Sequence, residues 1–141
     1  MFFNNKHYVG GYGDGIIYEI SNTTYTDNGA TIRRTRTAPP VLSTNRERLF
    51  FHRIELEFKA GTGLATGTGS DPQAMLSWSN DGGRTWSSEY WTDIGEIGEY
   101  TTRAIWRRTG QARQRMFRLE VSDPIECVIV GSYADITKGR A

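Results

Sequence analysis

The chain has 141 residues, a length that suits one domain with room for an appended arm. Lys and Arg number 17 and Asp and Glu 16, so the net charge of +1 excludes a strong overall attraction to nucleic acid or to an acidic membrane. A single cysteine, Cys127, excludes an internal disulfide and a thiolate metal cluster. No stretch after Met1 resembles a signal peptide or is long enough to cross a bilayer. We therefore expect no membrane span and synthesis in a reducing cytoplasm.

The first forty residues predict short hairpins. The β-rich run at residues 16–20 follows a glycine-rich segment containing Asp14-Gly15, which is a strong hairpin signal. Residues 31–37 alternate Thr and Arg and predict a strand with a basic face, which Pro39-Pro40 ends. We assign residues 1–40 to an N-terminal β-hairpin arm and residues 41–141 to a β-sandwich domain.

Residues 49–59 show the clearest alternation of apolar and charged side chains. Strict alternation places Phe50, His52 and Ile54 on the apolar face of a strand and Phe51 on the opposite face. Because no partner for catalysis or metal binding accompanies His52, we interpret it as a hydrogen-bonded histidine at the margin of the core.

A polar, glycine-rich turn separates two β-rich runs in the middle of the chain, and this pattern predicts a hairpin. Its sequence, Ser79-Asn80-Asp81-Gly82-Gly83-Arg84-Thr85-Trp86, has the spacing of the Asp-box, a hairpin motif of sialidases and of many β-propeller and β-sandwich proteins. An Asp at this position can accept backbone hydrogen bonds, and glycine can adopt positive φ. The motif normally lies away from active sites, so we interpret it as a rigid structural turn made by Ser79, Asp81, Gly83, Thr85 and Trp86.

The C-terminal part of the chain contains further strand patterns. Residues 100–108 and 115–122 alternate, and the nearly continuous apolar run at residues 125–133 predicts a central strand covered on both faces. No window has a helical period of useful length. Short strands with regular turn signals predict an all-β fold, an antiparallel β-sandwich built from hairpins.

Residues 101–118 hold six arginines and no acidic residue: Arg103, Arg107, Arg108, Arg113, Arg115 and Arg118. One interpretation is a face that contacts the phosphates of DNA without sequence specificity. The other is ion pairing with acidic strand faces such as Glu55, Glu57 and Glu120, within the chain or across a subunit boundary. We favour pairing or an interface. Nothing in the sequence indicates a module for sequence-specific recognition.

The chain contains residue types that catalyse reactions in other proteins, but the sequence does not place them in a catalytic motif. Glu96 and Glu99 lie in a turn broken by glycines, and neither His7 nor His52 has a nucleophile motif near it. A sialidase would need an arginine cluster, a tyrosine nucleophile and several Asp-boxes. We predict that the protein is not an enzyme and that it has no catalytic residue, metal site, cofactor or small-molecule substrate.

An ordered series of motifs resembles one protein family along nearly the whole chain. The longest is Met75-Leu76-Ser77-Trp78-Ser79-Asn80-Asp81-Gly82-Gly83-Arg84-Thr85-Trp86-Ser87; others are Asp14-Gly15-Ile16-Ile17-Tyr18, Ile32-Arg33-Arg34-Thr35-Arg36, Ile105-Trp106-Arg107-Arg108 and Val121-Ser122-Asp123-Pro124. The series is similar to the C-terminal region of the packaged-DNA stabilisation proteins, also called tail accessory or nozzle proteins, of short-tailed phages and prophages.

This resemblance implies a structural component of the virion tail, made in the bacterial host cytoplasm. It would join the portal and adaptor proteins, form a homo-oligomeric ring and help retain the packaged DNA. Members of the family are several times longer and carry an N-terminal β-propeller portion, so the resemblance implies that the arm of residues 1–40 is the remnant of a propeller blade. The chain is therefore expected to be either a piece of such a protein or a short stand-alone relative.

One alternative stays open on the residues alone, a carbohydrate-binding β-sandwich module of Asp-box type. It depends on the Asp-box and on three aromatic side chains that we expect to be exposed and able to stack on sugar rings, namely Tyr90, Trp91 and Trp106.

Overall fold

The computed structural model describes residues 1–59 and 61–139, and within these residues all regular secondary structure is β, without a helix. The strands in chain order are β1 (Phe2–Phe3), β2 (Lys6–Gly10), β3 (Ile17–Ile20), β4 (Thr26–Asp27), β5 (Ala30–Thr31), β6 (Arg34–Thr37), β7 (Val41–Leu42), β8 (Leu49–Phe58), β9 (Gln73–Ser79), β10 (Tyr90–Asp93), β11 (Ala104–Ala112), β12 (Gln114–Val121) and β13 (Ile129–Lys138).

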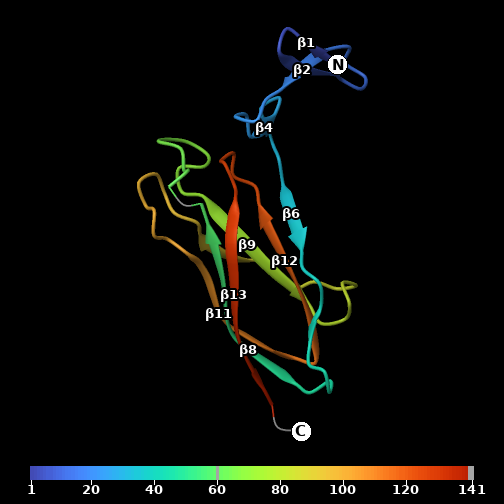
Figure 1. Cartoon of the computed structure of the whole chain (residues 1–141), viewed down its shortest axis with the longest axis vertical. Coiled ribbons are helices and arrows are strands. Elements are labelled where there is room, and N and C mark those ends of the chain that lie inside the picture. The colour runs from blue at the N-terminus through green and yellow to red at the C-terminus, as the bar shows by residue number, and fades with distance from the viewer. Residues whose placement is uncertain (60, 140–141) are drawn as a thin grey trace.

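Two antiparallel sheets make up the body of the molecule (Figure 1). The larger sheet has the order β10-β9-β12-β6, with β7 also paired to β12, and the smaller sheet has the order β11-β8-β13. The predicted all-β antiparallel sandwich is confirmed.

The hydrophobic core lies between these two sheets. The inward residues of β12 are Leu119 and Val121, and those of β11 are Ala104 and Trp106, as the alternation of each strand predicts. The rest of the buried cluster is Leu49, Phe51, Ile54, Leu56, Phe58, Ala74, Leu76 and Ile94.

The two long sides of the sandwich differ. On one side Trp106 of β11 is buried and its Nε1–H donates to the carbonyl oxygen of Tyr90 in β10 at 2.7 Å, which closes the sheets together. On the other side the edge strands are β6 and β13, and a groove opens between them.

The strict alternation predicted for residues 49–59 is wrong at its start. A β-bulge leaves His52 unpaired. On both neighbouring strands, β11 and β13, the pairing passes from Arg53 directly to Phe51. One extra residue moves the following or preceding side chains to the opposite face of a strand. Phe51 is therefore buried and Phe50 exposed, and the exposed His52 ring bonds the Thr137 hydroxyl at 2.7 Å.

The prediction of a doubly covered central strand at residues 125–133 is also wrong. The strand β13 begins at Ile129 and is the edge of the smaller sheet. The sequence has the apolar pattern of a strand covered on both faces, but in the structure of the single chain Val128, Ile129 and Val130 are exposed to solvent.

The N-terminal segment stands clear of the sandwich at one end (Figure 1). It contains the three-stranded sheet β1-β2-β3 and the small β4–β5 hairpin, whose strands pair with no strand of the sandwich. The next strand, β6, falls within the 1–40 segment assigned to the arm, yet it pairs with β12. The division of the chain at residue 40 stays a prediction.

Candidate functional site

The turn between β9 and β10 is organised by one carboxylate. Asp81 accepts hydrogen bonds from the Ser79 hydroxyl at 2.6 Å, from the Thr85 hydroxyl at 2.6 Å and from the backbone N–H groups of Arg84 and Thr85 at 3.0 Å. These donors hold the pKa of Asp81 well below its ordinary value, the Ser79 hydroxyl most strongly and the Thr85 hydroxyl next. Because both carboxylate oxygens bind the turn itself, the group is unsuited to proton transfer.

The tryptophan of this turn joins it to the sheet. Trp86 donates its Nε1–H to the carbonyl oxygen of Gly83 at 3.0 Å, and Gly83 has a φ of 92° that disfavours any side chain. The guanidinium of Arg118 on β12 lies 3.6 Å from the centre of the Trp86 ring. The geometry supports the interpretation of residues 79–86 as a stiff corner.

The six arginines of residues 101–118 lie in different environments. Arg103 binds the buried carboxylate of Glu55 at 3.0 Å, and among the described residues it is the one member of the six that forms an ion pair. Arg118 stacks on Trp86. The remaining exposed members are Arg107, Arg108 and Arg113, the last donating to the Arg46 carbonyl oxygen at 3.0 Å.

Arg115 is buried, with 2% of its surface exposed, although no carboxylate pairs with it in the described part of the chain. Its guanidinium donates to Asn80 Oδ1 at 2.9 Å and to the carbonyl oxygens of Thr109 and Gln111 at 2.5 and 3.2 Å. It also lies 4.6 Å from the centre of the Phe51 ring. Burial lowers the pKa of this arginine. The side chain ties the β11–β12 connection to the turn and is closed to any ligand.

An acidic group predicted to pair with this stretch has a different partner. Glu120 binds Arg33 through two contacts, Nε to Oε1 at 3.0 Å and Nη2 to Oε2 at 2.6 Å, and it accepts from Thr35 Oγ1 at 3.0 Å. Arg33 also pairs with Glu89. The Arg33 hydrogen bonds hold the pKa of Glu120 below its ordinary value. This cluster fixes the point at which the arm joins the sandwich.

A second arginine strengthens the same junction. Arg34 donates from Nη1 to the Ile125 carbonyl oxygen at 2.7 Å and from Nη2 to the Asp123 carbonyl oxygen. The sequence indicated only a basic strand face here, because the acceptors lie about ninety residues further along the chain.

The three aromatic candidates for a sugar platform are not equivalent. Trp106 is buried with its indole N–H bonded, so it offers no face to a ligand. Tyr90 stacks on Trp78 with ring centres 4.7 Å apart, and Trp91 is exposed. The expectation that Trp106 is exposed is wrong, and the carbohydrate-binding alternative is not favoured.

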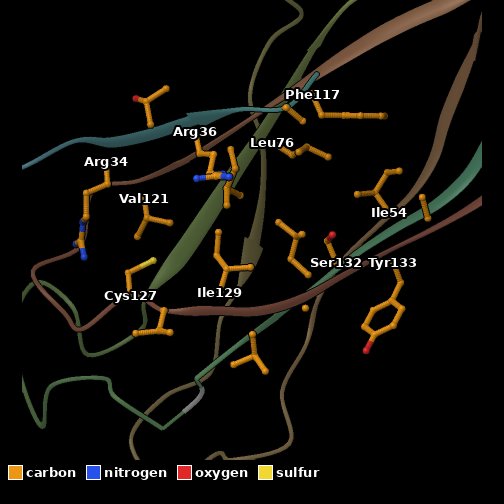
Figure 2. Close-up of a pocket in the computed structure, with 18 of the residues that line it drawn as sticks. Arg34, Arg36, Ile54, Leu76, Phe117, Val121, Cys127, Ile129, Ser132 and Tyr133 are labelled. Atoms are coloured by element: carbon orange, nitrogen blue, oxygen red, sulfur yellow. The ribbon is translucent and has the colours of Figure 1, made fainter. Parts of the chain in front are cut away.

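A groove with a volume of about 880 Å³ lies between β6 and β13. Figure 2 shows Leu76, Val121 and Ile129 pointing into it, with Cys127 beside them and Arg36 at its β6 rim. The lining contains two arginines, Arg34 and Arg36, and no carboxylate. Burial raises the pKa of the Cys127 thiol, which therefore stays neutral near pH 7. The groove has the character of a packing surface.

Two other kinds of site are absent from residues 1–59 and 61–139. No group of three or more His, Cys, Asp or Glu side chains is placed there to hold a metal ion. Over the same residues, no helix is long and apolar enough to cross a membrane.

Comparison with known proteins identifies the sandwich. No curated protein matches the chain. The family model described as "Bacteriophage P22 Gp10, beta-sandwich" matches residues 34–137, from the first residue of β6 almost to the end of β13. The match covers well over half of the chain, and it confirms the resemblance that the sequence motifs carry. The chain belongs to the bacteriophage P22 Gp10 β-sandwich family, a family of phage tail structural proteins.

Proposed function

We propose that this tail protein helps to stabilise and retain the packaged DNA in the virion, as a non-enzymatic part of the tail and portal complex. The observation that carries the proposal is the family match over residues 34–137, which spans the whole sandwich. The structural roles of the described polar groups agree with it. Asp81 binds its own turn and Glu120 binds the arm junction, so neither is free to act on a substrate.

The proposed partners are other copies of the chain, arranged in a ring, and the portal and adaptor proteins of the tail. A non-specific contact with DNA belongs to the same proposal. Arg107, Arg108 and Arg113 support it, because they are exposed and no ion pair engages them in the described part of the chain. The proposed place of synthesis is the cytoplasm of the bacterial host.

The test is to delete the coding sequence from the phage genome that carries it and to measure the DNA in the resulting particles. We expect heads that package DNA and then lose it, scored as DNA that becomes sensitive to nuclease. Resupplying the chain from a plasmid should restore protection. Particles that lack the chain and still retain their whole genome would contradict the proposal.

A further inference from the structure

We propose that the groove between β6 and β13 binds an extended segment of a different tail protein, which pairs with β13 as an added strand and places an acidic side chain against Arg36. The inference rests on the proposed function for the source of the segment, another protein of the tail and portal complex. The order of the strands, the lining of the groove and the position of Arg36 each support it.

The smaller sheet is one strand short on the side of the groove. The larger sheet has the order β10-β9-β12-β6 and the smaller sheet the order β11-β8-β13. On the closed side β11 lies against β10, where Trp106 donates to the Tyr90 carbonyl oxygen at 2.7 Å. Counted from that side, β9 and β12 are matched by β8 and β13, and β6 has no counterpart. The groove lies where the missing strand would stand.

The strand β13 offers a free edge to a neighbour. It has ten residues, Ile129–Lys138, and among the described strands it pairs with β8 alone. Alternate residues of an edge strand direct their backbone N–H and C=O groups away from the sheet, and an extended segment can bond to them. Ser132 and Ala134, opposite Leu56 and Ile54 of β8, line the groove and are small and exposed. They leave room for the side chains of an added strand.

The groove lining is mainly apolar, and its charged members are two arginines. Core residues of both sheets contribute to it, namely Ile54, Leu56, Leu76, Leu119 and Val121. A segment with apolar side chains on one face would cover this surface. One of the two arginines, Arg34, is already engaged by the carbonyl oxygens of Asp123 and Ile125.

Arg36, the other arginine, determines which charge the segment must carry. It lies directly opposite Leu119 in the register of β6 with β12, so its side chain is on the core-facing side of the sheet. Figure 2 shows it beside the groove. Arg36 is exposed, and within the described residues no carboxylate pairs with it. A segment that covered Arg36 without a negative charge would bury an unpaired cation, which is unfavourable. We therefore expect a glutamate or aspartate among its apolar residues.

Residues 1–31 do not hold such a segment ready. Their acidic side chains are Asp14, Glu19 and Asp27. Asp14 accepts a hydrogen bond from the Tyr18 hydroxyl at 2.6 Å, and Glu19 pairs with Lys6 at 2.8 Å. Asp27 lies in β4, a strand of two residues that is too short to follow β13. A second copy of the chain would bring the same arm. The acidic segment is therefore assigned to a different protein.

The test uses the whole chain and a synthetic peptide with blocked ends. The peptide alternates threonine with valine and carries glutamate in place of one central valine. Fluorescence anisotropy of the labelled peptide should show saturable binding. Replacing its glutamate by glutamine should raise the dissociation constant at least about tenfold, because Arg36 then lacks a charged partner. Arg36→Ala should bind both peptides alike, whereas Arg84→Ala, at the exposed turn, should keep the preference of the unmodified chain.

Two comparisons distinguish strand pairing from a general apolar contact. The peptide is N-methylated at every second residue in one version and at the intervening residues in another. Only one of these sets of N–H groups faces β13, so one version should bind at least about tenfold more weakly and the other should bind as before. Ala134→Trp, which fills the groove, should weaken binding at least about tenfold. Asp135→Trp, on the opposite face of β13, is the matched control and should leave binding unchanged.

Four outcomes would overturn the inference: no binding of the peptide, equal affinity for its glutamate and glutamine versions, equal effects of the two methylation patterns, or normal binding by Ala134→Trp. A groove that is already filled by other copies of the chain gives the first of these. The DNA-retention proposal would survive each outcome, because its test removes the entire chain from the particle. Peptide binding would likewise stand if particles without the chain kept their DNA, because it is measured on the purified chain.

Discussion

Two opposing effects act on the buried guanidinium of Arg115. Burial of an arginine without a carboxylate partner is unfavourable, as the lowered pKa of the group indicates. Three hydrogen bonds and the neighbouring Phe51 ring oppose this cost. A hydrogen bond to a charged group contributes about 1.5–3 kcal/mol, so three of them outweigh the burial of a delocalised, weakly hydrated guanidinium.

Replacing Arg115 should therefore destabilise the sandwich. We expect Arg115→Met to lower the free energy of unfolding by about 2 kcal/mol, because two backbone carbonyl groups lose their donor. Arg115→Lys should fail to restore stability, since a single ammonium cannot reproduce the planar fork. Urea denaturation followed by tryptophan fluorescence measures the change. Arg113→Ala is the matched control and should stay within about 0.5 kcal/mol of the unmodified chain.

The lowered pKa of Asp81 predicts that the stability of the fold decreases at acidic pH. Its pKa is lower in the folded chain than its ordinary value of 3.8, so its contribution is complete above that value and is lost as the pH falls through the lower, folded-state pKa. Melting temperatures measured from about pH 5 to about pH 2 should fall more steeply for the unmodified chain than for Asp81→Asn. Asp71→Asn, at an exposed position, should follow the unmodified chain. Parallel curves for all three would show that the turn does not depend on the Asp81 charge.

The residues of the turn could be named from sequence, whereas the burial of Arg115 could not. The signal was nevertheless present. Arg115 is in the same alternating phase as Phe117, Leu119 and Val121, all of which face the core side of β12. Its charge argued for the surface, and the acceptors that make burial tolerable are mostly backbone carbonyl groups, which no sequence pattern displays.

At the scale of the element, the bulge in β8 decides which of two adjacent phenylalanines belongs to the core. Phe51 is 1% exposed and Phe50 is 38% exposed, the reverse of strict alternation. We expect Phe51→Ala to reduce the free energy of unfolding by about 3–5 kcal/mol, because it leaves a cavity beside Phe117 and Arg115. Phe50→Ala should reduce it by less than about 1 kcal/mol. Thermal and urea unfolding of the two variants measure the difference, and similar losses would place the bulge elsewhere.

The hairpins β2–β3 and β9–β10 followed from strand patterns and turn residues, but long-range placement did not. The two glutamates that bind Arg33 lie 56 and 87 residues along the chain from it. The apolar pattern of residues 125–133 predicted a strand covered on both faces, which the structure contradicts. Pattern alone could not show that the sandwich supplies cover on only part of this segment and leaves Ile129 at the open rim of a groove.

At the scale of the whole molecule, the near-neutral net charge conceals an uneven distribution. Several arginines make contacts within the fold. Arg103 pairs with Glu55 and Arg33 with Glu120. Arg34 binds backbone carbonyl groups and Arg118 stacks on Trp86. Those that remain exposed on β11 are Arg107 and Arg108, and Arg108 adopts a φ of 56°, within the bulged part of the strand. Neither guanidinium group forms an ion pair within the described residues, so both, like Arg113, are candidates for contact with an external anion.

The same distribution predicts weak, salt-dependent binding to double-stranded DNA. Arg107→Ala with Arg108→Ala should weaken binding and reduce the slope of log affinity against log salt concentration by roughly 2, because each arginine neutralises one phosphate. Fluorescence anisotropy with duplexes of unrelated sequence measures this slope, and the duplexes should bind alike because no base is read. Arg84→Ala, at the exposed tip of the turn, controls for the removal of a single surface charge. A slope unchanged by the double substitution would show that β11 does not face DNA, and the role of the sandwich in DNA retention would then depend on its contacts with other proteins.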